Sequence, residues 1–317
     1  MDKTEKIYVA GHRGLVGSAI VRALKRQGYD NLVLKTREEL DLTNQTLVAD
    51  FFSREKPSYV FLAAAKVGGI LSNNTYPAEF IYQNLQIQNN VIERSYRHGV
   101  KKLLLLGSSC IYPKDCPQPM REEHLLTGSL EPTNEPYAIA KIAGIKMCQS
   151  YNRQYGTNFI AAMPTNLYGQ NDNFDLETSH VLAAMIRKFH EAKVHTRPTV
   201  TLWGTGTPVR EFLLVDDLAD ACIFLMNQFN PTKKQNERGD IFLNVGTGKG
   251  TTVAELATLI QAVTGFAGGI EWDATKPNGM AKKVMDSSRI HQLGWRHTTE
   301  LEAGLRQTYR WFSQSVT

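Results

Sequence analysis

The sequence predicts an α/β protein: a doubly wound parallel sheet followed by a smaller C-terminal α/β substrate lobe. Short apolar runs alternate with segments of helical periodicity from residue 7 to residue 162, and the alternation loosens beyond residue 170. Such alternation is typical of parallel strands covered by helices on both faces. At 317 residues and 42% hydrophobic content, the chain can bury a sizeable core.

The first half supplies five expected strands and four expected helices. Residues 7–10 form an apolar run that ends at a glycine turn, and apolar residues then recur with helical period from Leu15 until Gly28. The same patterns repeat downstream. They predict strands at 32–34, 59–63, 102–106 and 158–162, and helices at 43–55, 77–98 and 136–155.

The second half mixes elements less regularly. Its patterns predict a helix at 179–191, strands at 200–203 and 212–215, a helix at 216–228, an exposed polar loop at 231–240, a strand at 241–245, and helices at 253–263 and 301–312. We therefore expect a large domain over residues 1–170 to which the chain returns at about 212–247. Residues 171–211 and 248–317 are expected to form the smaller lobe.

Three glycines, Gly11, Gly14 and Gly17, follow the first expected strand and open the first expected helix. Without side chains there, a pyrophosphate can approach the backbone N–H groups at the helix start, where the helix dipole favours negative charge. An ordinary turn between packed elements is the alternative. This context predicts a Rossmann-type, dinucleotide-binding larger domain.

The residues after the second expected strand bear on the choice of nicotinamide cofactor. Many NAD enzymes have an acidic residue there that holds the ribose 2′-hydroxyl, whereas this chain reads Lys35-Thr36-Arg37. Arg37, with Arg13 from the glycine turn, can hold a 2′-phosphate. This predicts NADP(H), unless both arginines are simply solvated surface charges.

Tyr137 is followed four residues later by Lys141 on the same expected helix face. A lysine ammonium beneath the phenol favours its ionised form and makes the phenol a usable proton donor. By itself this spacing is more typical of an amphipathic surface. Its position, downstream of the glycine turn and of Ser108-Ser109-Cys110, makes a catalytic pair the better interpretation.

The order of these three motifs resembles the extended short-chain dehydrogenase/reductase family. The resemblance implies that Ser108 polarises a carbonyl, that Tyr137 supplies the proton and that Asp41 caps the adenine. It places the cofactor against Gly11, His12, Arg13, Gly14, Leu15, Val16, Gly17, Arg37, Asp41, Ala63, Ala64, Ala65, Leu106, Gly107, Ser108, Ser109, Lys141, Pro164, Thr165, Asn166, Leu167 and His180.

Three further segments resemble one member group of that larger family, the GDP-L-fucose synthase family. They are Leu-Gly-Ser-Ser-Cys-Ile-Tyr-Pro at 106–113, Ala-Ala-Ala-Lys-Val-Gly-Gly-Ile at 63–70 and Arg-Glu-Phe-Leu at 210–213. The Asp-Glu pair that dehydratases place after the serine is missing. The resemblance implies epimerisation of GDP-4-keto-6-deoxy-D-mannose at C3 and C5, then NADPH-dependent reduction at C4. Cys110 would be the base and His180 the opposing acid, if nearby positive groups lower the pKa of the thiol. For both residues a purely structural role is the alternative.

The same resemblance implies substrate contacts and a homodimer. The substrate contacts would come from Lys188, Trp203, Arg210, Asn278 and Lys283. Lys188 replaces an arginine usual in bacterial members, and Asn278 replaces what is commonly aspartate. The helices at 77–98 and 136–155 resemble those through which the family dimerises as a four-helix bundle.

Composition limits the compartment and the partners. The net charge of +5 is mild, with lysines and arginines scattered, so we expect no nucleic-acid partner. Four cysteines show no metal-site spacing, and no apolar stretch has signal-peptide or membrane-span length, so we expect no metal and a soluble cytoplasmic protein. Two rival functions stay open: a UDP-sugar 4-epimerase with tightly bound NAD, and a non-catalytic NADP-sensing module.

Overall fold

A six-stranded, fully parallel sheet forms the centre of the larger domain, as the sequence predicts. The computed structural model describes residues 1–176, 178–276 and 278–315. In spatial order β10-β5-β4-β3-β1-β2, every neighbouring pair is parallel. The strands are β1 (Ile7–Ala10), β2 (Leu32–Val33), β3 (Tyr59–Leu62), β4 (Lys102–Leu106), β5 (Phe159–Pro164) and β10 (Phe242–Val245).

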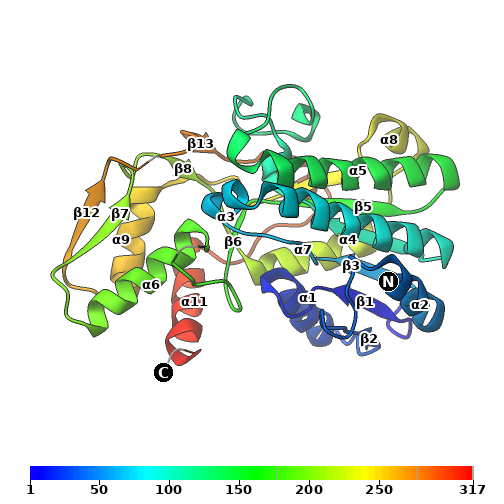
Figure 1. The fold of residues 1–317 in the computed structure, drawn as a ribbon, viewed down its shortest axis with the longest axis horizontal. Coiled ribbons are helices and arrows are strands. Elements are labelled where there is room, and N and C mark those ends of the chain that lie inside the picture. The colour runs from blue at the N-terminus through cyan, green and yellow to red at the C-terminus, as the bar shows by residue number, and fades with distance from the viewer. Residues whose placement is uncertain (177, 277, 316–317) are drawn as a thin grey trace.

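Helices cover both faces of this sheet (Figure 1). One face is covered by α1 (Leu15–Arg26) and α7 (Val215–Gln228), which pack with strand residues such as Val9 and Leu104. The other face is covered by α2 (Gln45–Glu55), α4 (Pro77–Arg97) and α5 (Glu135–Tyr155), which pack with strand residues such as Tyr8 and Leu103. Successive strand residues therefore enter opposite cores, as the two-residue period of a strand requires. The double winding explains why these strands are apolar on both sides.

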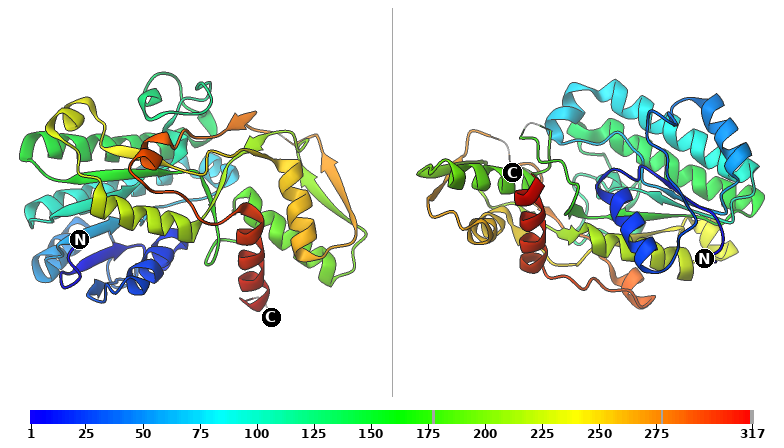
Figure 2. Two further views of the ribbon diagram at one scale, coloured as in Figure 1. Left: turned by 180° about the vertical axis from the view of Figure 1, so that it is seen from behind. Right: turned by 90° about the horizontal axis from the view of Figure 1, so that it is seen from below.

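The smaller lobe lies beside the larger domain (Figure 2). It has its own apolar core. It contains the helices α6 (Val181–Val194), α9 (Val253–Thr264) and α11 (Leu301–Ser315) and a parallel strand pair, β7 (Thr199–Trp203) with β12 (Gly269–Asp273). The helix α6 packs on β7 and α9, and α11 packs on α9. Phe189, Leu256 and Phe312 are buried in this core.

Two small sheets lie where the chain passes between the lobes. The strands β6 (Asn166–Tyr168) and β9 (Phe212–Leu214) form a parallel pair. The strand β8 (Val209–Arg210) lies between β11 (Thr251–Thr252) and β13 (Lys282–Lys283). Met285 then bridges Met120, and α10 (Ser288–Gln292) packs on β10, so this late segment lies against the larger sheet.

The expected exposed loop at 231–240 is wrong, because part of it is the helix α8 (Lys233–Arg238). The Thr232 hydroxyl and the Gln235 side chain form a reciprocal capping box, and Gly239 ends the helix at φ +89°. The segment is polar and has no apolar residues at helical spacing, so its periodicity did not indicate a helix. Short elements were also not predicted: α3 (Ile70–Thr75), the strands β6, β8, β11, β12 and β13, and the 3₁₀ turns η1 (Ser109–Ile111), η2 (Glu122–His124) and η3 (Pro132–Asn134).

Among residues 1–176, 178–276 and 278–315, no helix is both long enough and apolar enough to cross a membrane.

A buried lysine joins the sheet to α7. The Lys102 side chain of β4 donates from Nζ to the carbonyls of Leu225 (2.9 Å), Met226 (3.0 Å) and Phe229 (2.6 Å). These carbonyls end α7, where helices leave acceptors unsatisfied and where the dipole favours a cation. Burial lowers the pKa of Lys102 to about 8, so the ammonium is mostly charged at neutral pH.

We expect Lys102→Met to destabilise the protein by about 1–3 kcal/mol at pH 7, because buried carbonyls lose their donor. Urea denaturation of the variant and wild type measures the difference. The neighbouring Lys101 has an exposed side chain paired with Glu5, so Lys101→Met is the matched control and should change little. Equal stability of Lys102→Met and wild type would show that the buried ammonium is not needed.

Candidate active site

The glycine turn after β1 divides into positions required for packing and one position left open. Gly11 has φ +84°, and a Cβ there would lie 2.7 Å from the Ala64 nitrogen. A Cβ on Gly17 would lie 2.0 Å from the Gly11 oxygen. A Cβ on Gly14 would meet only the Gly11 oxygen, at 3.5 Å, which is ordinary contact. Gly11 and Gly17 are therefore required for packing within the turn. Gly14 is not, and its missing side chain leaves space free in front of the helix α1.

The start of α1 is suited to a phosphate. Gly14 is its N-cap without a side-chain hydrogen bond, and its first turn carries no acidic residue. Free N–H groups and the positive end of the helix dipole therefore face the open space at Gly14. These residues fit the pyrophosphate of a dinucleotide.

Two predicted cations meet at the end of β2. Arg13 and Arg37 are both exposed, and both act on the Glu38 carboxylate, whose pKa is lowered first by hydrogen bonds within its own turn and then by the two arginines. Positive charge from two segments therefore converges where the sequence predicts a 2′-phosphate. Asp41 accepts hydrogen bonds from the Thr43 N–H (2.9 Å) and hydroxyl (2.8 Å), which shape the turn before α2.

Ser108, Tyr137 and Lys141 come from β4 and α5. Ser108 follows β4 and caps η1, where its hydroxyl accepts a hydrogen bond from the Cys110 N–H at 3.4 Å. Lys141 Nζ donates to the Leu106 carbonyl at 2.7 Å and lies 5.6 Å from the centre of the Tyr137 ring. The hydrogen bond from Lys141 therefore fixes α5 against the end of β4, next to Ser108.

The predicted effect of Lys141 on Tyr137 is outweighed by burial. Burial, with a smaller contribution from Cys110, raises the pKa of the Tyr137 phenol, and burial lowers the pKa of Lys141 to about 8. A charge is costly to remove from water, and one ammonium above the ring does not offset that cost. Tyr137 is therefore protonated at neutral pH and holds the proton that a reduction consumes.

Lys283 lies within electrostatic reach of both residues predicted for epimerisation. Burial raises the pKa of the Cys110 thiol, and Lys283, Ser108 and Lys141 only partly oppose it. The expectation that nearby positive groups lower this pKa is thus wrong in its net direction. Burial and then Lys283 lower the pKa of His180. The resting forms at neutral pH are a thiol and a neutral imidazole.

On the smaller lobe, cations lie around an exposed indole. The Trp203 ring is 61% exposed, with Lys188 Nζ at 5.7 Å and Lys276 Nζ at 5.6 Å from its centre. Lys276 was not among the predicted contacts, because a lone surface lysine gives no sequence signal. Nearby, Arg210 donates to the Asn278 carbonyl at 3.4 Å, and the Asn278 side chain accepts from the Thr205 N–H at 2.8 Å. Pro277, between Lys276 and Asn278, lies outside the described residues.

The remaining predicted residues follow the strand ends. Ala63 to Ala65 follow β3, Gly107 and Ser109 follow β4, Pro164 ends β5, and Thr165 to Leu167 lead into the β6–β9 pair. His12, Leu15 and Val16 belong to the glycine turn and the start of α1. All of them therefore lie along the carboxyl edge of the sheet, where ligands bind in this architecture.

The Gly68-Gly69 pair supports the segment before His180. The Gly69 N–H donates to the Thr178 carbonyl at 3.0 Å, and a Cβ on Gly69 would lie 3.0 Å from the Ser179 oxygen. The alanine-glycine segment that follows β3 thereby holds the residues preceding α6. This contact explains why a glycine is needed so far from the sheet.

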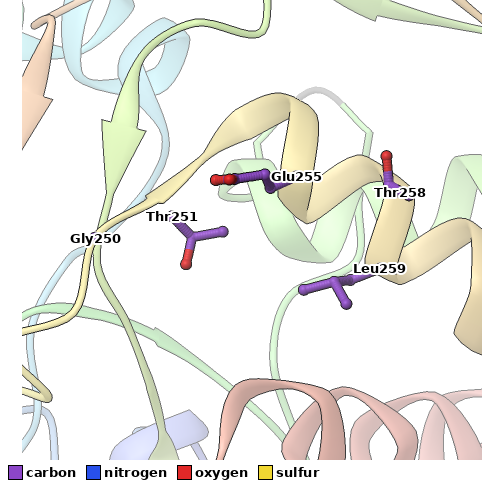
Figure 3. Close-up of a pocket in the computed structure, with 5 residues that line it drawn as sticks. All are labelled: Gly250, Thr251, Glu255, Thr258 and Leu259. Carbon is purple, nitrogen blue, oxygen red and sulfur yellow. The ribbon is translucent and has the colours of Figure 1, made fainter.

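A surface depression beside α9 is not part of this site (Figure 3). It is lined by Gly250, Thr251, Glu255, Thr258 and Leu259. None of these residues is among the predicted contacts, and the Glu255 carboxylate is occupied in capping α9 through Thr252.

Comparisons with known proteins agree with this geometry. The family model described as "NAD dependent epimerase/dehydratase family" matches residues 7–246. GDP-L-fucose synthase 1 of Arabidopsis thaliana is 61% identical over 99% of this chain and 95% of its own length. GDP-L-fucose synthase of Escherichia coli strain K12 is 54% identical over 98% and 97%. The solved structure of a GDP-mannoheptose C4 reductase from Campylobacter jejuni with NADP bound is 42% identical, covers 99% of both chains and has a TM-score of 0.91.

We expect Gly14→Ala to keep the fold but weaken NADPH binding about tenfold or more, because the added methyl group occupies the space in front of α1. Fluorescence titration with NADPH measures the affinity, and thermal unfolding measures the fold. Gly17→Ala is the contrasting variant: its methyl group collides with the Gly11 backbone, so it should lower the melting temperature. Unchanged NADPH affinity in Gly14→Ala would contradict the assigned phosphate position.

Proposed function

Because the chain belongs to the NAD dependent epimerase/dehydratase family, we propose that it is an NADP(H)-dependent 3,5-epimerase and 4-reductase that converts GDP-4-keto-6-deoxy-D-mannose to GDP-L-fucose. The observation that supports the proposal is that Cys110 hydrogen bonds to Ser108 and interacts with Tyr137, while Lys283 acts electrostatically on both Cys110 and His180. A simple reductase needs only the serine, tyrosine and lysine. The added pair supplies proton transfer.

Epimerisation follows from the acidity of carbons next to a ketone. With the C4 carbonyl oxygen held by Ser108 and Tyr137, removal of a proton from C3 or C5 gives an enolate whose charge those two hydroxyls stabilise. Inversion then requires a proton from the opposite face. We assign these two transfers to Cys110 and His180. Since the resting pair is thiol and imidazole, a proton must pass from Cys110 to His180 before Cys110 acts as the base.

Reduction uses the same carbonyl. Bound NADPH supplies a hydride to C4, and the oxyanion that forms takes the Tyr137 proton while Lys141 lies beside the ring. Above pH about 8, Lys141 loses its charge, so its support for the phenolate that remains is lost. The raised pKa of Tyr137 keeps the proton in place across the neutral range.

The chain's own residues favour NADP(H) and a nucleoside diphosphate sugar. Arg13 and Arg37 supply paired charge for a 2′-phosphate, and the residues directly after β2 include no acidic side chain before Glu38, on which both arginines act. Arg210 and Lys283 supply charge for the two phosphates, and Trp203 offers an aromatic plane. Lys188 has the positive charge of an arginine but not the two-pronged hydrogen-bonding geometry of a guanidinium. The Asn278 side-chain oxygen already accepts a hydrogen bond from the Thr205 N–H. We assign cofactor binding to residues 1–170 with 212–247, and sugar binding to 171–211 with 248–317.

The test is turnover of GDP-4-keto-6-deoxy-D-mannose in deuterated water, with the product identified by NMR. We expect NADPH oxidation, a lower Michaelis constant for NADPH than for NADH, and deuterium at C3 and C5. Cys110→Ser and His180→Gln should each lower exchange at these carbons by about a hundredfold or more, because one proton-transfer partner is missing. Cys148→Ser, a buried thiol outside the site, is the matched control and should keep exchange.

Other outcomes separate the rival functions. Exchange retained in both variants would remove Cys110 and His180 from the mechanism. NADPH oxidation without inversion at either carbon would indicate a plain C4 reductase. NAD found in a denatured extract would favour a UDP-sugar 4-epimerase, and NADPH binding without any turnover would favour a sensing module.

We also propose a homodimer, formed by two copies of α4 and α5 as a four-helix bundle, in the cytoplasm. Two apolar side chains on these helices, Tyr82 and Ile139, are 62% and 40% exposed. A depression lined by Asn89, Arg94 and Tyr151 opens on the same helices, and the Arg94 Nε atom is buried there without a hydrogen-bond partner in the described part of the chain. Exposed apolar side chains and an orphan donor are groups that a partner helix pair would cover.

We expect light scattering after size exclusion to give twice the mass of 35.6 kDa. Tyr82→Glu should shift the protein towards monomer, because it places a charge in the buried centre of the bundle. Val194→Glu, at the 60% exposed end of α6, is the control and should stay dimeric. A monomeric wild type at micromolar concentration would contradict this assembly.

A further inference from the structure

Glu211 is a fully buried carboxylate that the proposed chemistry does not use. It directly follows β8, in the Arg-Glu-Phe-Leu segment, and is 0% exposed. One oxygen accepts the Met285 N–H at 2.7 Å, and the other accepts the Gly248 N–H at 2.8 Å. A buried carboxylate needs such donors to offset the loss of water.

The two backbone groups that Glu211 holds belong to the segments on either side of β8. β8 is the middle strand of its small sheet, with β13 on one side and β11 on the other. Met285 lies just beyond β13, and Gly248 lies just before β11. The Glu211 carboxylate therefore links, through hydrogen bonds, the segment after β13 and the segment before β11, which are the two neighbours of β8.

The strand pairing at this point fixes two cations of the cleft. Lys283 of β13 is the direct neighbour of Arg210 of β8. Lys283 is also the charge that acts on both Cys110 and His180. Two like charges side by side repel each other, so their positions depend on backbone contacts around them. Glu211 makes one such contact on each strand, since it directly follows Arg210 and accepts the N–H of Met285, two residues after Lys283. Val284, between Lys283 and Met285, also donates its N–H to the Gln118 side chain at 3.0 Å.

The main chain of Glu211 also contacts the segment after β5, which is predicted to border the cofactor. Its carbonyl accepts hydrogen bonds from the Thr165 hydroxyl at 3.1 Å and from the Asn166 side chain at 2.8 Å. Thr165 lies between β5 and β6 and Asn166 begins β6, in the segment predicted to border the nicotinamide. The room around the carboxylate is closed, because a Cβ on Gly246 would lie 2.1 Å from its oxygen.

We propose that Glu211 is a positioning residue for the substrate: by holding the backbones of Met285 and Gly248, its carboxylate sets Arg210 and Lys283 in place for the diphosphate of the sugar nucleotide and Lys283 for the Cys110–His180 pair. This inference rests on the proposed function. It concerns the placement of charges and not their presence, because the buried Glu211 carboxylate is itself engaged by the backbone N–H groups of Met285 and Gly248.

The test variant is Glu211→Gln, which keeps the shape but turns one acceptor oxygen into an amide NH₂ facing a backbone N–H. We expect the dissociation constant of GDP and the KM of the GDP-sugar to rise about tenfold, with NADPH affinity within about twofold of wild type. Calorimetry with GDP measures the first without requiring turnover. If wild type binds GDP but does not convert the sugar, the proposed function fails while the role of Glu211 can still be judged.

Asp217→Asn is the matched control. Asp217 is likewise buried, at 4% exposure, and its carboxylate accepts the backbone N–H groups of Thr298 and Thr299 at 3.1 Å each, away from the cleft. It should lower the melting temperature as Glu211→Gln does but leave GDP affinity and KM unchanged. An equal loss of GDP affinity in both variants would reduce Glu211 to a general stabiliser of the fold.

A double-mutant cycle with Lys283→Gln tests the route of the effect. In the Lys283→Gln background, Glu211→Gln should weaken GDP binding by about threefold or less, because the charge that it positions is gone. A full tenfold effect in that background would overturn the proposal. Glu211→Asp, which keeps the charge on a shorter side chain, is the second variant. If neither Glu211 variant folds while Asp217→Asn does, Glu211 determines the fold only and the proposal is wrong.

Discussion

The parallel register of the large sheet is the constraint on which the site depends. Because β1, β3, β4 and β5 run in the same direction and are paired in sequence-independent backbone ladders, their carboxyl ends meet at one edge. Gly11, Ala63, Ser108 and Thr165 are far apart along the chain and come together only for this reason. The Lys141 bond to the Leu106 carbonyl then attaches α5, with Tyr137, to the same edge.

Burial, more than the charge of near neighbours, governs the chemistry at that edge. Tyr137, Cys110 and His180 are each shifted towards their neutral form, although cations lie close by. The thiolate and imidazolium that epimerisation requires must therefore be formed from neutral groups, against the cost of burying charge. The surrounding cations then act on the phosphates and on the enolate as it forms.

The sequence was sufficient for the parts of the fold that follow a periodic pattern. The strands of the large sheet and the long helices were predicted within a few residues, because apolar period and glycine stops mark them. The two-residue strands β8, β11 and β13 carry no period at all, and α8 is polar throughout, so only caps and tertiary contacts define them. In the site, motif residues such as Gly14 and Lys141 were predictable. The net direction of the pKa shifts was not predictable, because it depends on how deeply each group is buried. The contact of Lys276 with Trp203 was not predictable either, because it joins segments that are distant in sequence.

The β6–β9 pair also determines how the two lobes can move. The chain leaves the large sheet through β6 and comes back through β9, and the two strands are hydrogen bonded side by side. A single flexible linker would allow the lobes to swing apart freely. The chain crosses between the lobes again after β10 and around β13, where β11, β8 and β13 pair in a second small sheet. Paired strands therefore join the lobes at two places, and such ribbons resist stretching and shear more than a single linker does.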